Sequence, residues 1–328
     1  MTQSRSVVGF IGLGAIGYPM AERLVQGGED VIVYNRTPAK AARFCGRAKI
    51  AASPAEMGDQ ADVIFACLTT AHSYRDVVLG PFGIMSGSRV KTYVHLGTNE
   101  VTLLEELAAS LEARGIATLD APMTGGTDGA ANGTLTVMAA GPREAFDRIR
   151  PLIEHYANTI VFLSERVGMA QVMKLVNNVI SAGNLAVACE AMLLGRKSGL
   201  DPAVMLEIIN NGSGQSNATL TRIPAQILTR KFGQGAGLRL ATTILEMARA
   251  EAKLCDVPMP LAEAIIASFQ KAATHEGDTA DVTSIIRPME RAAGVTLGSA
   301  ANNESHNAGA SAMAETRLLS LSRLAQER

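Results

Sequence analysis

A glycine-rich turn near the start of the chain has the spacing of a phosphate-binding loop. The turn follows the apolar run Val7 to Ile11 and precedes a helical stretch from Tyr18 to Gln26. In a G-x-G-x-x-G turn the first glycine allows a tight bend, the second lets backbone approach a pyrophosphate, and the third lets the helix pack on the strand. The phosphate then lies at the N-terminus of the helix. The setting predicts dinucleotide binding by Gly12, Leu13, Gly14, Ala15, Ile16 and Gly17.

The end of the second predicted strand bears on which dinucleotide is bound. NAD is usually held there by a carboxylate on the ribose hydroxyls, whereas this chain has Asn35, Arg36 and Thr37. A guanidinium can bind a 2'-phosphate through charge-assisted hydrogen bonds, and Asn35 and Thr37 can add further ones. The residues therefore favour NADP(H) over NAD(H). The alternative is a solvated arginine at a strand end in a protein that binds NAD(H).

A second glycine-rich segment follows another predicted strand, over residues Asp120 to Gly126. Its backbone N–H groups at Gly125 and Gly126 stand beside the hydroxyl of Thr124, a combination that suits a small carboxylate. An ordinary turn explains the same residues equally well, so both interpretations stay open at this point.

A polar stripe runs along the longest predicted helix, from Met169 to Lys197. Gln171, Lys174, Asn178 and Ser181 recur at i, i+3, i+7 and i+10, so they share one face of the helix. The stripe is either the solvated face of a surface helix or the lining of an internal cleft. In a cleft, a lysine is costly unless it has a function or a partner.

The pattern of the chain predicts an α/β fold with two domains and a tail. Short apolar runs alternate with helical stretches up to about Ser164, which indicates a doubly wound, mostly parallel sheet of Rossmann type. After that point 3.6-residue periodicity predicts only helices. We expect a dinucleotide-binding domain over 1–166, an all-α domain over 167–294, and a flexible tail over 295–328 with a short amphipathic end. The expected later helices span 220–229, 238–255, 260–276 and 282–293.

Composition narrows the classes of function. The chain has 328 residues, of which 47% are hydrophobic, and a formal charge of −1, so it can bury a large core and does not favour a polyanion or an acidic membrane. We expect no nucleic-acid partner, no membrane span, no signal peptide and a cytoplasmic location. Four separated cysteines predict reduced, mostly buried thiols, and five scattered histidines predict loop or helix-surface positions and no metal site. These residues are Cys45, Cys67, Cys189 and Cys255, and His72, His95, His155, His275 and His306.

Together, these motifs resemble the β-hydroxyacid dehydrogenase family. The resemblance covers about residues 7 to 293 and rests on the nucleotide-binding turn, the D-A-P-x-[ST]-G-G loop and the helical G-x-x-x-x-x-K-x-x-x-N segment, in that order. The family includes 3-hydroxyisobutyrate dehydrogenases and tartronate, glyoxylate and succinic semialdehyde reductases. It implies a Rossmann domain joined by a long helix to an all-α domain like that of 6-phosphogluconate dehydrogenase. It also implies a homodimer or homotetramer and a carboxylated small-molecule substrate bound between the domains.

The resemblance also implies roles for individual residues. Lys174 matches the catalytic lysine that relays a proton, and Asn178 matches the amide that binds substrate beside it. Thr124, Gly125 and Gly126 match the loop that holds the substrate carboxylate, although the family more often has serine at the first position. Three further residues match positions that border the cofactor, namely Leu68, Thr69 and Thr98.

One departure from the family concerns the later helix. Thr243 and Ile244 stand where the family usually has a Lys-Asp pair, so a cation is missing from the expected cleft and the substrate class is less constrained. Two alternatives follow. An imine reductase has a similar fold but generally replaces the lysine that Lys174 matches, and a catalytically silent dinucleotide-binding scaffold would not need Lys174 or Asn178.

Overall fold

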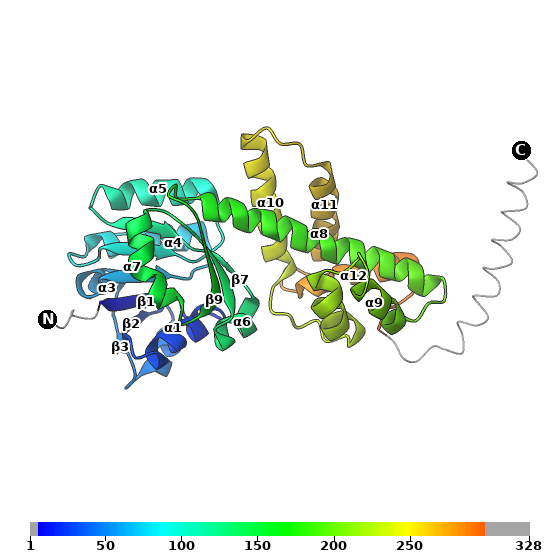
Figure 1. Cartoon of the computed structure of the whole chain (residues 1–328), viewed down its shortest axis with the longest axis horizontal. Helices are drawn as coiled ribbons and strands as arrows, with labels where there is room; N and C mark the ends of the chain where they lie inside the picture. Colours follow the sequence, from blue (N-terminus) through cyan, green and yellow to red (C-terminus); the bar gives the residue numbers. More distant parts are fainter. Residues whose placement is uncertain (1–5, 299–328) are drawn as a thin grey trace, which may run out of the picture. The chain divides into compact units, whose positions relative to one another are not determined.

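The computed structural model describes residues 6–298, which divide into two compact units between Asn177 and Asn178, inside one long helix (Figure 1). In the first unit the described residues form a nine-stranded sheet of order 3-2-1-4-5-6-8-7, with β9 paired to β8. The strands are β1 Val7–Ile11, β2 Asp30–Tyr34, β3 Lys49–Ile50, β4 Val63–Ala66, β5 Thr92–His95, β6 Ala117–Asp120, β7 Met123–Thr124, β8 Leu135–Ala140 and β9 Ala157–Ser164.

The sheet is parallel from β3 through β6, which confirms the predicted Rossmann-type fold. Its order reverses between β1 and β4, and in such sheets ligands bind outside the carboxyl ends of the strands at this switch point. The pairs β6–β8 and β7–β8 are antiparallel. The short strands β3 and β7 were not expected, because two residues carry no periodicity.

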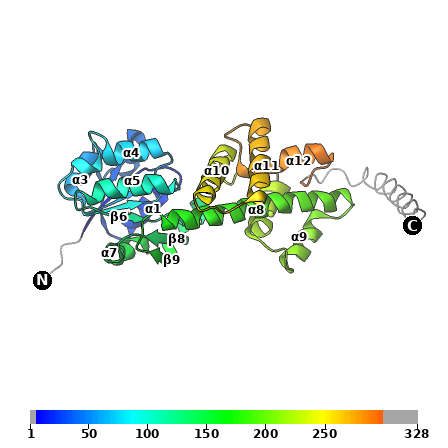
Figure 2. The same cartoon turned by 90° about the horizontal axis from the view of Figure 1, so that it is seen from above.

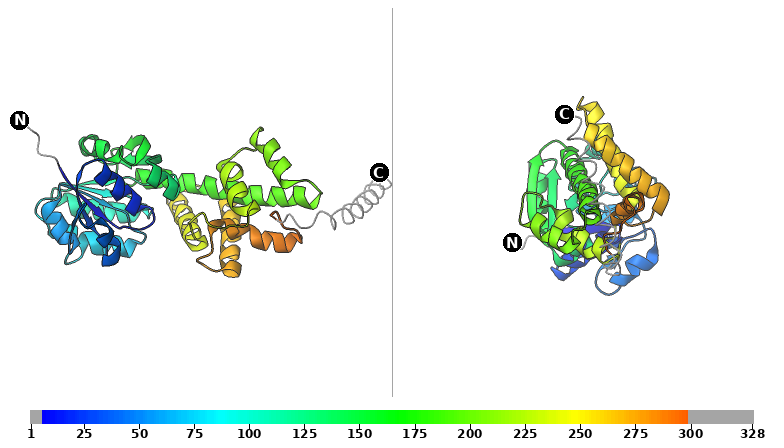
Figure 3. Two further views of the ribbon diagram at one scale, coloured as in Figure 1. Left: turned by 90° about the horizontal axis from the view of Figure 1, so that it is seen from below. Right: turned by 90° about the vertical axis from the view of Figure 1, so that its right-hand side faces the viewer.

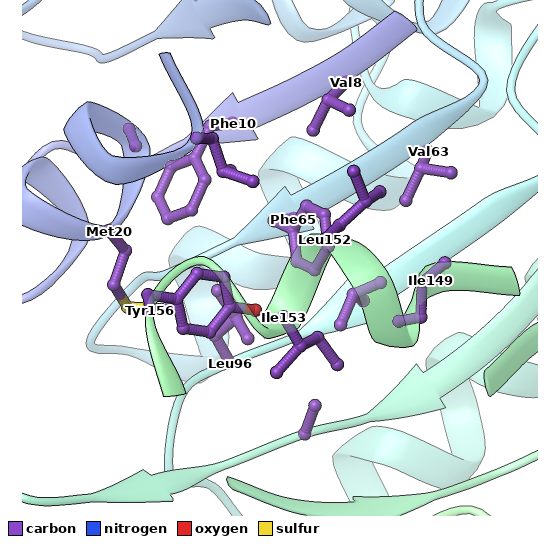
Figure 4. Close-up of a cluster of buried hydrophobic side chains, with 14 of the residues drawn as sticks. Val8, Phe10, Met20, Val63, Phe65, Leu96, Ile149, Leu152, Ile153 and Tyr156 are labelled. Carbon is purple, nitrogen blue, oxygen red and sulfur yellow. The ribbon is translucent and has the colours of Figure 1, made fainter. Parts of the chain in front are cut away.

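Helices cover both faces of the sheet (Figure 2). The buried side chains of the strands alternate between two apolar layers, one on each face. On β4, Val63 and Phe65 pack on one face, while Ile64 packs on the other. Figure 4 shows the first layer, where Phe65 and Tyr156 meet edge to face at 6.3 Å. The helices of this unit are α1 Gly17–Gln26, α2 Pro38–Ala41, α3 Pro54–Gln60, α4 Ala71–Leu79, α5 Val101–Glu112, α6 Gly126–Asn132 and α7 Arg143–Ile153, with 3-10 turns at η1 Ala42–Phe44 and η2 Ile84–Ser86.

The second unit is helical, as predicted (Figure 3). It has its own apolar core. Helix α8 begins and ends at the expected residues, and Gly199 follows it with a φ of +95°. Asp201 caps the next helix by accepting hydrogen bonds from the N–H groups of residues 203 and 204. Its helices are the part of α8 Met169–Lys197 that follows residue 177, then α9 Pro202–Asn210, α10 Leu238–Leu254, α11 Pro260–Glu276 and α12 Ile286–Ala293, with the π-helix η3 Ala218–Leu228 and the 3-10 turn η4 Val282–Ile285.

Two expectations about this unit need correction. The segment predicted as an α-helix over 220–229 is wound as a π-helix that contains Pro224, whose missing N–H and bulky ring disfavour regular α-helical winding. The tail does not begin at residue 295, because Leu297 is buried and its N–H donates to Glu290 at 3.0 Å. Residues 299–328, with the expected amphipathic end, lie outside the described residues.

Helix α8 also corrects the expectation that no segment could span a membrane. By length and composition it could, although only 33% of its most apolar window is buried. Core helices of soluble proteins meet the same criterion. Part of this helix does pack within the chain, since Leu185, Met192 and Leu193 belong to the core of the second unit.

The thiols differ from expectation as well. None of the four cysteines is disulfide-bonded, but Cys45 and Cys255 are exposed, so the thiols are not mostly buried. Both exposed residues end a helical segment, where the chain turns at the surface.

Candidate nucleotide-binding and catalytic site

The glycine loop after β1 is shaped by two close backbone approaches. Gly12 has a φ of +94°, and a Cβ there would lie 2.2 Å from the carbonyl oxygen of Cys67. A Cβ on Gly17 would lie 2.0 Å from the carbonyl oxygen of Gly12, so both positions require glycine. Gly14 differs, because a Cβ there would meet nothing within 4 Å. This open space, beside a helix N-terminus without a side-chain cap, fits a pyrophosphate.

The three residues at the end of β2 have different environments. Asn35 braces the glycine loop, since its Oδ1 accepts from the Leu13 N–H at 2.9 Å and its Nδ2 donates to the Thr37 carbonyl at 3.0 Å. Arg36 and Thr37 are exposed. The side chain of Asn35 is thus largely committed within the protein, while Arg36 faces solvent where an adenosine ribose is expected.

Tyr74 supports the loops that follow β4 and β5. Its hydroxyl accepts from the Leu68 N–H at 2.9 Å and lies 3.1 Å from the carbonyl oxygen of Ala66. Its ring stacks on His95, with centroids 3.8 Å apart. Leu68 is half-buried and Thr69 is exposed. The loop after β4 is therefore held on its protein side by Tyr74 and is open to solvent at Thr69.

A buried polar network joins the ends of β5 and β6 to the first turn of α8. Gln171 is fully buried, and its Nε2 donates to Asp120 Oδ1 at 2.7 Å and to the Gly97 carbonyl at 2.9 Å. Its Oε1 accepts from the Asn99 N–H, and its own backbone N–H donates to Asp120 Oδ2, both at 2.9 Å. The Asn99 amide nitrogen lies 3.1 Å from His95 Nε2. Thr98, beside Asn99, is half-buried.

Burial sets the protonation of this network. Desolvation raises the pKa of Asp120 to about 7 against the lowering effect of its hydrogen bonds with Gln171, and it lowers the pKa of His95 to about 3. If Asn99 Nδ2 donates to Nε2, neutral His95 carries its proton on Nδ1 and donates to the Tyr93 hydroxyl at 3.2 Å. The expectation that His95 lies in a loop or on a helix surface is wrong, because His95 is fully buried on β5. A strand that is buried on both faces can hold a polar side chain when that side chain has hydrogen-bond partners, as His95 has in Tyr93 and Asn99.

Residues 124–126 connect β7 to α6. Thr124 is half-buried and opposite Thr136 in the antiparallel pair with β8. Gly125 and Gly126 have φ values of +126° and +67°, so both require glycine, and both are exposed. This segment therefore presents open backbone beside a hydroxyl.

The polar stripe of α8 is not its most exposed face. Gln171 is buried, and Lys174 and Asn178 are half-buried, as is Ser181. The exposed positions of the helix include large apolar side chains instead. Their exposed fractions are 39% for Met173, 46% for Val176, 58% for Ile180, 61% for Val187 and 72% for Leu194.

Comparisons with known proteins identify the family of this chain. Residues 7–164 match the NAD binding domain of 6-phosphogluconate dehydrogenase, and residues 168–289 match the NAD-binding domain of NADP-dependent 3-hydroxyisobutyrate dehydrogenase. An uncharacterized oxidoreductase of Shewanella frigidimarina is 33% identical over 87% of this chain and 98% of its own length. The 2-(hydroxymethyl)glutarate dehydrogenase of Eubacterium barkeri is 30% identical over 88% and 97%, respectively. The chain belongs to the β-hydroxyacid dehydrogenase family.

Solved structures support the same assignment to the β-hydroxyacid dehydrogenases. The Mycobacterium tuberculosis 3-hydroxyisobutyrate dehydrogenase matches with a TM-score of 0.79 and 26% identity, covering 87% of this chain and 99% of that one. A structure described as Psf3 in complex with NADP+ and 2-OPP matches at 0.77 and 27%, covering 86% and 99%. An imine reductase of Streptomyces aurantiacus is more distant, at 0.58 and 21% over 86% and 99%, and shares the fold alone. The protein is therefore an NAD(P)-dependent oxidoreductase that acts on CH–OH groups.

The departure from the usual β-hydroxyacid dehydrogenase pattern lies on α10. Thr243 is exposed and Ile244 half-buried, so neither replaces the charge of the usual Lys-Asp pair. Within residues 6–298, no group of three or more His, Cys, Asp or Glu side chains could hold a metal ion.

The buried pair His95 and Asp120 predicts opposing effects of pH on stability. The Asp120 pKa is raised from 3.8 to about 7, so its contribution to stability is lost as pH rises through that range. The His95 pKa is lowered from 6.5 to about 3, so its contribution is lost as pH falls through that range. Each effect has a slope of about 1.4 kcal/mol per pH unit, and between about pH 4 and pH 6.5 they cancel.

Replacing either His95 or Asp120 should reveal how the other residue makes the free energy of unfolding depend on pH. The unfolding free energy of Asp120→Asn should rise with pH between pH 4 and 6.5, and that of His95→Gln should fall, relative to the wild type. Denaturant unfolding at several pH values measures these slopes. Parallel curves for all three proteins would show that the two groups titrate as they do in the unfolded chain.

Proposed function

We propose that the protein is an NADP(H)-dependent dehydrogenase that interconverts a 3-hydroxyacid and the matching semialdehyde, with Lys174 as the proton relay. The observation that carries this proposal is the position of Lys174, three residues after Gln171, whose side chain is hydrogen-bonded to the ends of β5 and β6. Relatives named 2-(hydroxymethyl)glutarate and 3-hydroxyisobutyrate dehydrogenase support the substrate class.

The proposed preference for NADP(H) rests on the end of β2. Arg36 is exposed there, and residues 34–37 include no carboxylate that would hold a ribose 2'-hydroxyl or repel a phosphate. The similar structure that contains NADP+ supports the same preference. In the proposed site Arg36 and Thr37 bind the 2'-phosphate. Asn35 contributes chiefly by holding the glycine loop in place.

Each element then has a part in the reaction. The loop from Gly12 to Gly17 binds the pyrophosphate, and the loops at Leu68, Thr69 and Thr98 border the cofactor. The bound nicotinamide supplies or accepts the hydride. Residues Thr124, Gly125 and Gly126 bind the substrate carboxylate through backbone N–H groups and a hydroxyl.

The side chains on α8 handle the substrate oxygen. Lys174 donates a proton to that oxygen during reduction and removes it during oxidation. Asn178, one turn further along the helix, hydrogen-bonds the oxygen and fixes its position. Because both residues lie within the continuous α-helix α8, the distance between them is set by the helix itself.

A cofactor and substrate screen tests the proposed function. The purified protein is assayed with NADPH and NADH against glyoxylate, succinic semialdehyde, methylmalonate and tartronate semialdehydes, a bulky aryl aldehyde and a cyclic imine. We expect oxidation of NADPH by a short carboxylated aldehyde. Turnover of the imine alone would favour the imine reductase alternative, and NADPH binding without any turnover would favour a silent scaffold.

We also propose that the protein is cytoplasmic and forms a homodimer or homotetramer. The exposed apolar residues Met173, Ile180, Val187 and Leu194 on α8 repeat every seven residues, a spacing that suits packing of a helix against a second copy of itself. A single apolar stripe of this kind, repeated on an identical partner, gives a self-complementary interface. Sedimentation equilibrium measures the mass, and a mass of one chain would contradict this assembly.

A further inference from the structure

The start of α8 is held by side chains from distant parts of the sequence. The first N–H groups of a helix have no partner within the helix and need acceptors from elsewhere. Here Asp120, 51 residues earlier in the chain, accepts from the backbone N–H of Gln171 at 2.9 Å. The same carboxylate accepts from the Gln171 side chain at 2.7 Å. Asp120 thus fixes both the backbone and the side chain of one residue in the first turn.

The hydrogen bonds of the Gln171 side chain can all form in only one position of the helix. Its two N–H donors point to Asp120 Oδ1 and the Gly97 carbonyl, and its acceptor points to the Asn99 N–H. Because donors and acceptors differ, sliding or rotating the helix by one residue would leave buried groups unpaired, at a cost of about 1–3 kcal/mol each. Apolar residues at these positions would avoid the cost of burying a carboxylate. The polar residues therefore define a unique position of the helix, at some expense in stability.

Lys174 follows Gln171 by three residues and shares its side of the helix. The backbone of Lys174 therefore moves with the first turn, and the position of its amine depends on where that turn is seated. A misplacement of about 1 Å in a reacting group costs about a hundredfold in rate. The two buried residues, Asp120 and Gln171, set this position relative to the strand ends that bear the cofactor loops.

We propose that Asp120 and Gln171 are positioning residues of the reaction, which seat the first turn of α8 on the ends of β5 and β6 so that Lys174 meets the substrate oxygen. The inference rests on the proposed role of Lys174. It adds two fully buried residues that act through the helix.

The test uses Gln171→Leu and Asp120→Asn in the full chain. We expect kcat to fall by between ten- and a hundredfold in both, with KM for the aldehyde and Kd for NADPH within threefold of wild type. Hydrogen exchange of the peptide that spans residues 168–176, measured without ligands, should quicken in both variants. Asp120→Asn replaces one of the two acceptor oxygens with an N–H donor, and Gln171→Leu removes the side-chain bonds that hold the first turn on the strand ends. Asp120→Asn keeps the shape of the side chain, so it remains informative should Gln171→Leu fail to fold.

Thr118→Val is the matched control. Thr118 lies on β6, two residues before Asp120, and its buried hydroxyl has no hydrogen-bond partner among the described residues. This change removes a buried polar group from the same strand and should leave kcat and hydrogen exchange unchanged. A similar loss of kcat in the control would show a general effect of altering β6.

Three results would contradict the proposal, and they can be told apart. Unchanged kcat in Gln171→Leu and Asp120→Asn, with faster exchange at 168–176, would show that seating the helix does not matter for the reaction. A rise in KM with unchanged kcat would assign the two residues to substrate binding. Full activity of Lys174→Ala would instead remove the proposed function, together with the reason for positioning this turn.

Discussion

Replacement of Lys174 by alanine is expected to lower kcat by about a thousandfold, because a positioned general acid or base contributes about 10²–10⁴-fold to a proton transfer. The fold should persist, since Lys174 is half-buried on a helix and alanine is the best helix former. Binding of NADPH should persist too, because the glycine loop is unchanged. Steady-state kinetics at saturating NADPH, NADPH fluorescence titration and thermal unfolding measure the three quantities.

Two further variants make the Lys174 prediction specific. Lys174→Arg keeps the positive charge but cannot give up its proton near neutral pH, so it should be nearly as impaired as the alanine variant. Lys253→Ala, which removes an exposed lysine from α10, is the control and should have wild-type activity. An active Lys174→Arg would show that charge alone is needed. Loss of NADPH binding in Lys174→Ala would place the lysine in the cofactor site.

Replacement of Arg36 by alanine is expected to weaken NADPH binding by about thirtyfold and to leave NADH binding within twofold of wild type. A hydrogen bond to a charged group contributes about 1.5–3 kcal/mol, and only NADPH carries the 2'-phosphate. Because Arg36 is exposed, the preference for NADPH in the wild type should shrink as salt concentration rises. Fluorescence titrations with both cofactors at two salt concentrations measure these effects.

The arginine control for this experiment is Arg114→Ala, which removes an exposed guanidinium from the turn after α5 and should alter neither titration. Equal weakening of NADPH and NADH by Arg36→Ala would assign Arg36 to a part that the two cofactors share. No weakening of either would support the alternative of a solvated arginine at a strand end.

The parts of the fold that the sequence predicts well are those with local signals. Helices α8 and α11 begin and end at the predicted residues, since Gly199 and Pro260 are strong helix boundaries. The π-helical winding around Pro224 was not predicted, because π-helices are rare and the periodicity used to predict helices assumes 3.6 residues per turn. The core of the sheet followed from the alternation of apolar runs, whereas the two-residue strands β3 and β7 depend on tertiary pairing.

The candidate site could be predicted from the sequence as a set of motifs, whereas the contacts that support those motifs could not. The G-x-G-x-x-G turn can be recognised in the sequence because Gly12 and Gly17 each meet a local steric demand. The bond from Asn35 to Leu13 crosses 22 residues, and the bond from Asp120 to Gln171 crosses 51, so no spacing rule indicates either. His95 was assigned to the surface because its partners, Tyr93 and Asn99, are recognisable only once the strand is folded.

The distribution of the four thiols gives the protein natural attachment points for probes. Cys45 is exposed in the first unit and Cys255 in the second, whereas Cys189 is buried and burial raises the pKa of Cys67 to about 12. Since thiolates are the reactive form, maleimide dyes or spin labels should modify one site per unit without engineering. The distance between those labels, measured with and without NADPH, then reports whether cofactor binding moves one unit relative to the other.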